Sequence, residues 1–444
     1  MAKKATKKSV KKVKKKLEEN ESGGKDIDFG DIFGKAIENV AKKSGKNVTE
    51  FDANLRSALV GVPLGYFALE ACFSETVLGL GRIICFDGLQ ASGKSSLMFE
   101  LCRIIDAAGG ASCIIDTEQK ATQDLGPSIV GYDNWPKIKY VSPETFEEAL
   151  QVITGTVNLL SKAAEKQGKR IPLLIGLDST GGTVTDAEAE KIDKEGTASR
   201  SYAGAALLAA KYLPRITKSL SGMPIVFVGV RHERMVDMGN GIKTPEPKGT
   251  AEWSYAAFAT FHMQKNGSDI DKVESGGRPI LIYLKKGTEP GLRVPVILSW
   301  RDETLETETG EIEHRRYMRF DWERAAFDLL TNPEKYKVPQ RIIKAFKTVL
   351  GPMNAAAGKV SCKPLGLDSP ATPEELHQAL YHPDNRKVLD RLRAAFCIRV
   401  GQEFKYGDDF DEMKLKQQAL LLSRREPSRE EDVIEIEVES ELSE

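Results

Sequence analysis

The sequence predicts an α/β protein with a mostly parallel central sheet flanked by helices, plus an N-terminal helix and a small α-rich C-terminal domain. Strand-like apolar runs alternate with helical stretches from about residue 58 to residue 300. The apolar runs are almost continuous, which is typical of parallel strands that are buried on both faces. Beyond Pro333 the pattern changes to helices. The sheet is therefore expected in the middle of the chain, with a separate helical region after it.

The predicted elements follow in order along the chain. Residues 31–47 ("DIFGKAIENVAKKSGKN") have Ile32, Phe33, Ala36, Ile37 and Val40 at helical spacing and end at Ser44-Gly45, which predicts one amphipathic helix. The predicted strands are 82–86, 111–115, 173–178, 225–230, 258–263, 280–284 and 294–299. The predicted helices are 95–108, 146–166, 338–350 and 373–396. The last two or three strands have short connections and are expected to form an antiparallel edge, and 351–371 is expected to be a loop.

Charge is distributed unevenly along the 444 residues, although the net charge is only −1. Residues 1–16 carry nine lysines and no acid, whereas residues 430–444 carry eight acids and no base. Such blocks are usually solvated, disordered arms. The alternative is interaction: the lysine arm with polyanions, and the acidic tail as an internal competitor for a basic groove. The expected division of the chain is a disordered lysine-rich arm (1–26), an N-terminal helix region (27–57), the core (58–330), a C-terminal domain (331–425) and an acidic tail (426–444).

Composition excludes several classes of protein. No run approaches the ~18 consecutive apolar residues of a membrane span, and no apolar segment follows the basic N-terminus as in a secretory signal. The six cysteines form no C-x-x-C pair and the five histidines are scattered, which argues against a zinc site. We therefore expect a reducing, cytoplasmic protein without a membrane partner.

A phosphate-binding pattern, G-x-x-x-x-G-K-S, begins directly behind the predicted strand 82–86. The two glycines let the backbone N–H groups point inward as an anion nest, the lysine reaches the β- and γ-phosphates, and the serine hydroxyl binds Mg²⁺. The helix that follows adds the positive end of its dipole. A plain glycine-rich turn is the competing explanation, but the strand-before and helix-after context argues against it. The expected nucleotide contacts are Gly88, Leu89, Gln90, Ala91, Ser92, Gly93, Lys94, Ser95 and Ser96.

Two later strands end in carboxylates. "CIIDTE" (113–118) places Asp116 and Glu118 just after an apolar run, where a carboxylate faces the same crevice as the phosphates and orients the attacking water. Capping of the next helix is an equally good explanation of these acids when they are taken alone. "LLIGLDS" (173–179) ends in Asp178-Ser179, the Walker B pattern in which the aspartate holds Mg²⁺. The order of the three motifs favours a nucleotide site over three coincidences.

Together these motifs resemble the RecA recombinase family, meaning bacterial RecA and its virus-encoded relatives of the UvsX type. "GLGRIICFDGLQASGKSSL" is similar to the family's strand and P-loop, "CIIDTEQ" to the strand that ends in its catalytic glutamate, and "LLIGLDSTGGTVTDAEAE" to its Walker B strand. "MPIVFVGVRHERMVDMGNGIKTPEPKGTAEWSYAAFATFHM" is similar to the segment that holds its second DNA loop, and "ILIYLKKG" to the strand whose lysines reach a neighbour's ATP. The resemblance covers roughly residues 30–300.

The resemblance implies a set of roles. ATP and Mg²⁺ are the implied cofactors, with Asp178 and Ser95 at the metal, Glu118 as catalytic base and Lys94 as the P-loop lysine. Lys285 or Lys286 is implied to reach the γ-phosphate of the adjacent subunit. The two DNA loops would be residues 181–200 and 231–249, whose basic residues would contact the DNA backbone. These residues are Arg200, Arg231, Arg234, Lys243 and Lys248.

One departure from the family concerns the strand before the second loop. The family usually ends that strand in Asn-Gln or a similar polar pair, which senses the γ-phosphate. Here Gly229-Val230 stands at the expected place, in "FVGVRHE". Either Arg231 or His232 takes over the sensing role, or ATP is coupled to DNA differently.

By resemblance, the implied function is a DNA-dependent ATPase that forms a helical filament on single-stranded DNA and pairs it with a homologous duplex, in repair and recombination. Single-strand-binding or loader proteins are further implied partners, and the location is the nucleoid or the cytoplasm of an infected cell. The 31–43 stretch would dock on a neighbouring protomer, or else pack on its own core. The rival functions are a ring-forming helicase or RadA/KaiC-like motor, a non-catalytic scaffold that coats DNA, and a small-molecule kinase.

Overall fold

The computed structural model of the protein falls into two units, Met1–Ser57 and Ala58–Glu444, and all described residues lie in the second. The lysine arm, the helix predicted at 31–47 and the acidic tail all lie outside the described residues. The structure describes residues 60–118, 125–167, 171–181, 184–195, 202–220, 223–237, 243–247, 251–265, 277–287, 292–306, 312–334, 336–351, 353, 354–356 and 358–404.

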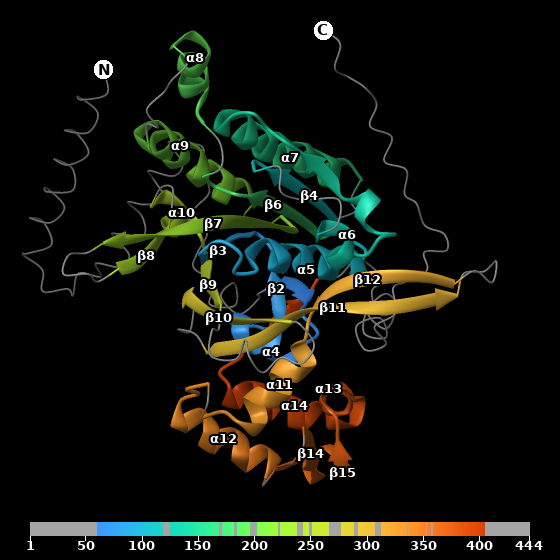
Figure 1. Ribbon diagram of the computed structural model, residues 1–444. Helices are drawn as coiled ribbons and strands as arrows, with labels where there is room; N and C mark the ends of the chain where they lie inside the picture. Colours follow the sequence, from blue (N-terminus) through green and yellow to red (C-terminus); the bar gives the residue numbers. More distant parts are fainter. Residues whose placement is uncertain are drawn as a thin grey trace, which may run out of the picture. The chain divides into compact units, whose positions relative to one another are not determined.

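A ten-stranded sheet runs through the second unit in the order β12-β11-β10-β9-β3-β7-β6-β4-β5, with β8 paired to β7 beside this path (Figure 1). The pairs from β9 through β3, β7, β6 and β4 to β5 are parallel, whereas β9 to β12 pair antiparallel. The predicted α/β class and the antiparallel edge are therefore confirmed. The strands of this sheet are β3 (Arg82–Gly88), β4 (Ala111–Asp116), β5 (Lys139–Val141), β6 (Leu173–Asp178), β7 (Ile225–Asp237), β8 (Lys243–Pro247), β9 (Ala259–Lys265), β10 (Arg278–Lys286), β11 (Arg293–Glu306) and β12 (Ile312–Phe320).

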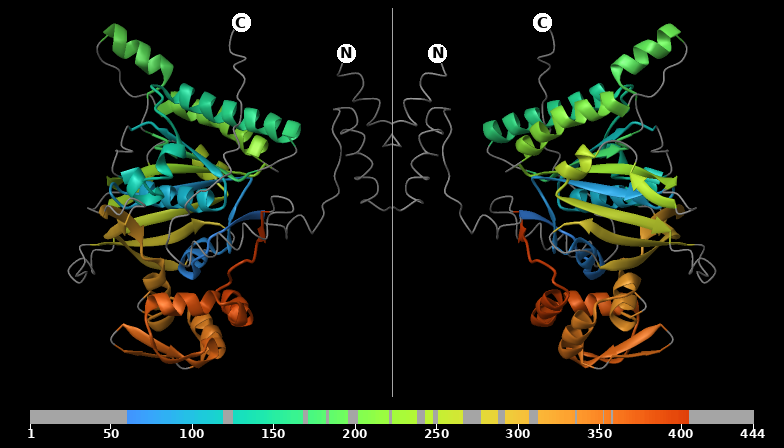
Figure 2. Two further views of the ribbon diagram at one scale, coloured as in Figure 1. Left: turned by 90° about the vertical axis from the view of Figure 1, so that its right-hand side faces the viewer. Right: turned by 90° about the vertical axis from the view of Figure 1, so that its left-hand side faces the viewer.

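Helices cover both faces of the sheet, because alternate residues of each strand point to opposite sides. Ile83 and Cys85 of β3 pack into one core with α7, α9 and α10, whereas Ile84 and Phe86 pack into the other with α4, α5 and α11. Figure 2 shows α7 and α9 together on one side of the sheet. The helices described are α4 (Phe67–Phe73), α5 (Lys94–Ala107), α6 (Leu125–Val130), α7 (Phe146–Gln167), α8 (Asp186–Glu195), α9 (Tyr202–Leu220), α10 (Glu252–Ala256), α11 (Trp322–Thr331), α12 (Gln340–Leu350), α13 (Pro373–Tyr381) and α14 (Arg386–Ala395).

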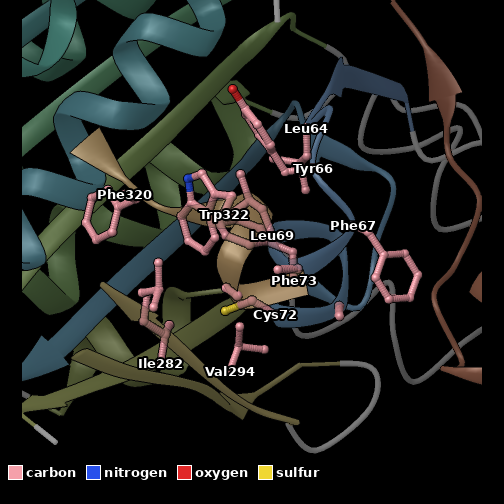
Figure 3. Close-up of a cluster of buried hydrophobic side chains, with 14 of the residues drawn as sticks. Leu64, Tyr66, Phe67, Leu69, Cys72, Phe73, Ile282, Val294, Phe320 and Trp322 are labelled. Atoms are coloured by element: carbon pink, nitrogen blue, oxygen red, sulfur yellow. The ribbon is translucent and has the colours of Figure 1, made fainter. Parts of the chain in front are cut away.

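The larger core joins segments that are far apart in the sequence. Figure 3 shows Phe73 of α4, Ile282 of β10, Val294 of β11 and Trp322 of α11 gathered in one cluster. Each of these side chains is at most 5% exposed, and burial of such a side chain stabilises the fold by roughly 1.5–3 kcal/mol. This packing fixes the antiparallel edge of the sheet against α4 and α11.

The C-terminal region differs from the sequence-based expectation. Residues 351–371 were expected to be a loop, and that is wrong: β13 (Asn354–Ala356), β14 (Lys359–Cys362) and β15 (Leu367–Ala371) form an antiparallel three-stranded sheet. The helix expected at 373–396 is two helices, because Pro383 begins a short 3-10 turn between α13 and α14. At the end of the described chain β16 (Gln402–Glu403) pairs with β1 (Val60–Pro63), which also pairs with β2 (Val77–Gly79).

Candidate functional site

The loop between β3 and α5 requires glycine at two positions. Gly88 has φ +157°, and a Cβ there would lie 2.2 Å from the carbonyl oxygen of Met263. Gly93 is the N-cap of α5 with φ +88°, and a Cβ there would lie 2.5 Å from Cδ1 of Ile280. Both backbone conformations are costly for residues with a side chain. The loop is thus held against β9 and β10 with its backbone close to the start of α5.

Lys94 is folded back over this loop. Its Nζ donates to the carbonyl oxygens of Gly88 (3.0 Å) and Leu89 (2.7 Å). Burial lowers the pKa of Lys94 to about 8, against the opposing effect of Asp178, Glu233 and other nearby carboxylates. Nζ also donates to the Ser92 hydroxyl (3.5 Å), so these three acceptors are all neutral. A buried ammonium group with neutral hydrogen-bond acceptors favours an anionic ligand. The loop therefore fits a polyphosphate.

Asp178 ends β6 beside the first turn of α5. Burial raises the pKa of Asp178 to about 6, although a hydrogen bond with Ser95 opposes the shift. Asp116, its register partner on β4, and Glu118 add negative charge to the same place. Among the described residues, no group of three or more His, Cys, Asp or Glu side chains is arranged to hold a metal ion. The Ser95–Asp178 pair fits a Mg²⁺ ion that takes its other ligands from phosphates and water.

Glu118 is fixed by a dense set of contacts. Its backbone N–H donates to Asp116 Oδ1 (2.9 Å), and the Ser179 hydroxyl donates to its Oε1 (2.6 Å). Nε2 of His232 lies 3.0 Å from the same carboxylate oxygen. Thr117 binds the backbone of Ser179 through its hydroxyl, which ties the ends of β4 and β6 together. The structure thus brings Glu118, His232 and Asp178 to one edge of the sheet.

Tyr140 is a member of this cluster that sequence reasoning missed. Its hydroxyl donates to Asp116 Oδ2 at 2.8 Å. Burial and this hydrogen bond raise the pKa of Tyr140 to about 12. Tyr140 lies on β5, a strand of three residues, so no periodic pattern marks it. Pairing of β5 with β4 brings it beside Asp116.

The expected second DNA loop is largely a β-hairpin. β7 extends to Asp237, and its last five residues pair antiparallel with β8. In this pairing Glu233 lies opposite Pro247, and Asp237 lies opposite Lys243. Arg234 and Lys243 are exposed on its two strands. Lys248 lies outside the described residues, as does Arg200 of the other expected loop, in which α8 forms a helix.

Arg231, an expected DNA contact, is buried in this structure. Its side chain is only 2% exposed and forms an ion pair with Asp87 of β3. Burial alone would lower the pKa of Arg231, but the hydrogen bond with Asp87 and the negative charges nearby together raise it. The pairing was missed because the two residues are 144 positions apart.

The two candidate inter-subunit lysines differ in their surroundings. A register shift between Leu284 and Lys286 leaves Lys285 as an extra residue in β10, and its side chain is exposed. Such bulges redirect side chains at sheet edges. Nζ of Lys286 donates to the carbonyl oxygens of Ser254 (2.6 Å) and Ala257 (2.6 Å), so Lys286 binds the end of α10. Lys285 is therefore the better placed of the two to meet another molecule.

Fold and site together define a class: an α/β protein with a P-loop-type glycine turn and carboxylates at the ends of neighbouring parallel strands. Curated proteins named "Protein RecA" are similar to this chain. One from Mycobacterium sp. (strain KMS) is 26% identical over 57% of the chain and 65% of its own length. One from Nocardia farcinica is 28% identical over 45% of the chain and 54% of its own length. One from Frankia alni is 25% identical over 59% of the chain and 67% of its own length.

These matches support a relationship to the RecA family, and they agree with the α/β core. The chain covers 65% of the length of the first of these relatives, which is less than two thirds. No protein-family model matches the chain. None of the helices among the described residues is long and apolar enough to cross a membrane.

Proposed function

We propose that the protein is a DNA-dependent ATPase of the RecA type, which forms a helical filament on single-stranded DNA and pairs it with a homologous duplex. Within that family we place it among bacterial RecA and its UvsX-type, virus-encoded relatives. The observation that carries the proposal is the gathering of Lys94, Ser95, Glu118 and Asp178 at one edge of a parallel sheet. The similarity to proteins named RecA supports the DNA-related part.

ATP would bind over the turn formed by residues 88–95. The backbone N–H groups of the turn and of the start of α5 would bind phosphate oxygens. Lys94 would release the carbonyl oxygens of Gly88 and Leu89 and donate to phosphate oxygens instead. Mg²⁺ held by Ser95 and Asp178 would neutralise charge on the phosphates. Ser95 and Asp178 are already hydrogen-bonded to each other, so little rearrangement is needed to form this site.

Glu118 would orient the attacking water and accept its proton. Ser179 and His232 both contact Oε1 of Glu118, which fixes the orientation of the carboxylate towards the water. His232 is also the better candidate for sensing the γ-phosphate, because Arg231 is buried in its pair with Asp87. His232 would report the state of the nucleotide to β7 and so to the β7–β8 hairpin.

DNA would be bound by the hairpin through Arg234 and Lys243, with Arg200 and Lys248 as further proposed contacts. Exposed cations on a strand suit the phosphate backbone, which dominates affinity without reading sequence. Lys285, or Lys286 after release from α10, would reach the nucleotide of an adjoining copy. Single-strand-binding or loader proteins are proposed as further partners.

The test is the ATPase rate as a function of single-stranded DNA concentration, with electron microscopy of the same sample. We expect DNA to stimulate turnover and long helical filaments to form with ATP. Lys94→Ala should abolish both the turnover and its stimulation. Activity that survives unchanged in Lys94→Ala would refute the assignment of the site.

The rival functions give different results in the same experiment. A ring-forming motor gives closed rings in the micrographs in place of filaments. A scaffold that only coats DNA keeps its DNA binding in Glu118→Gln and shows no turnover to lose. A small-molecule kinase shows turnover that does not depend on DNA.

A further inference from the structure

Arg231 and Asp87 form a buried, two-point ion pair between neighbouring strands. Nε of Arg231 donates to Oδ1 of Asp87 at 2.6 Å, and Nη2 donates to Oδ2 at 2.5 Å. The two side chains are 2% and 1% exposed. They are register partners on β7 and β3, and Asp87 directly precedes Gly88, the first residue of the candidate phosphate loop.

The same guanidinium also binds the helix that follows the hairpin. Nη1 of Arg231 donates to Oγ of Ser254 in α10 at 2.7 Å. Arg231 lies where β7 leaves the sheet, and α10 begins soon after β8 ends. The Arg231 side chain therefore joins the two ends of the segment that contains the hairpin, the end of β7 in the sheet and α10. It also joins both of them to β3. Lys286 holds the carbonyl oxygens at the end of the same helix.

The next residue, His232, makes its contacts on the other side of β7. Successive side chains of a strand point to opposite faces. Arg231 lies on the α10 face with Asp87, whereas His232 meets Glu118 near Asp178 and α5. The root of the hairpin is thus tied to the phosphate loop from one face and to the carboxylate cluster from the other.

We propose that Arg231 and Asp87 are positioning residues that couple the phosphate loop to the β7–β8 hairpin. An ion pair that is fully buried is costly to separate, because each charge would be left without its partner in the interior. The ends of β3 and β7 consequently move as one body, and a shift of the loop on nucleotide binding passes to the hairpin. This replaces the route through a polar pair at positions 229–230, where the chain has a buried Gly-Val.

The coupling itself does not require DNA; only its use in DNA binding rests on the proposed function. It is tested in the full chain by hydrogen exchange at residues 232–237 and 243–247, with and without Mg²⁺ and a non-hydrolysable ATP analogue. We expect the nucleotide to change exchange in the wild-type hairpin by about fivefold or more, the range of typical coupling between sites. A wild-type hairpin that does not respond, while α5 does, overturns the proposal.

The decisive variant is the double substitution Asp87→Leu with Arg231→Met, which removes both charges together and is therefore tolerated better than a single removal. We expect α5 to keep its response to the nucleotide while the hairpin loses its own. Ser254→Ala keeps the ion pair and loses only the bond to α10, so its hairpin response should fall part of the way. Should the double variant fail to fold, Ser254→Ala decides: a full wild-type response there overturns the proposal.

A matched control is the ion pair at the other end of β3, between Arg82 and Glu75 (3.0 Å). The double substitution Glu75→Leu with Arg82→Met should leave the response of the hairpin unchanged, which separates coupling from general stability. Nucleotide-dependent affinity for a single-stranded oligonucleotide is then measured on the same set. If wild-type protein binds no DNA but its hairpin responds, the proposed function fails and the coupling stands.

Discussion

At the scale of single residues, the position of Glu118 is specified by its neighbours rather than by its own strand. Asp116, Ser179 and His232 hold its backbone and one of its carboxylate oxygens. This arrangement fixes where a proton acceptor would stand. Orientation of this kind is what general-base catalysis requires.

Glu118→Gln keeps the size and hydrogen-bonding of the side chain but removes the base. We expect ATP turnover to fall by about 10²–10⁴-fold, the usual contribution of a positioned acid or base, with nucleotide affinity little changed. Turnover is measured with saturating single-stranded DNA, and affinity by calorimetry. Glu334→Gln, at an exposed site outside the cluster, is the control. Loss of nucleotide affinity in step with turnover would contradict the role given to Glu118.

His232→Ala removes the contact with Glu118 but leaves the ion pair of Arg231 in place. We expect the stimulation of turnover by DNA to drop by about tenfold, while DNA-independent turnover changes less, because the root of the hairpin loses its direct contact with Glu118. The ratio of the two rates is the measurement. An unchanged ratio would remove His232 from the proposed sensing role.

The pKa values of Lys94 and Asp178 predict a pH optimum for Mg²⁺–nucleotide binding. Lys94, with its pKa lowered to about 8 by burial, must be charged to bind phosphates, so affinity falls as the pH rises through 8. Asp178, with its pKa raised to about 6 by burial, must be ionised to bind Mg²⁺, so affinity falls as the pH drops through 6. Calorimetric titrations from about pH 5 to about pH 9 check this. Without Mg²⁺ the acid limb should vanish; its persistence would contradict the assignment of Asp178.

At the scale of elements, the β7–β8 hairpin is the candidate DNA-binding element, and its two strands carry exposed cations. Lys243→Ala should weaken binding of single-stranded DNA to the same degree for all sequences. It should also reduce the slope of log affinity against log salt concentration by about one, the value expected for the loss of one phosphate contact. Binding is followed by fluorescence anisotropy over a salt series. Lys218→Ala, an exposed lysine on α9, should leave the slope unchanged. Equal effects of the two variants would show that the hairpin is not the contact.

Contiguous motifs could be predicted from the sequence, and contacts between distant elements could not. The glycine turn, Glu118 and Asp178 each follow a recognisable apolar strand, so their meeting at one sheet edge follows from parallel pairing. The pairing of Arg231 with Asp87 depends on which strands are neighbours, and β7 lies beside β3 although three strands separate them in the chain. Strands β13 to β15 have three to five residues, too few to show an alternating pattern.

At the scale of the whole second unit, a buried ion pair links α4, near the start of the described residues, to α14, near their end. Nε and Nη2 of Arg393 in α14 donate to the carboxylate of Glu70 in α4, both at 2.7 Å. The hydroxyl of Tyr381 in α13 donates to the same carboxylate at 2.8 Å. Burial raises the pKa of Glu70 against the opposing effect of Arg393. Helices α13 and α14 are therefore held to α4 by charge as well as by apolar packing.

Arg393→Met leaves the carboxylate of Glu70 buried without its counter-charge, and we expect the free energy of unfolding to fall by about 3–5 kcal/mol. The triple variant Glu70→Leu, Tyr381→Phe and Arg393→Met removes the buried carboxylate together with both of its hydrogen-bond donors and should recover most of that loss. The control is Lys194→Met, which breaks an exposed pair with Glu190 on α8 and should cost less than about 1 kcal/mol. Urea unfolding followed by tryptophan fluorescence measures all three. A triple variant no more stable than Arg393→Met would mean that packing, rather than the buried charge, holds α14 to α4.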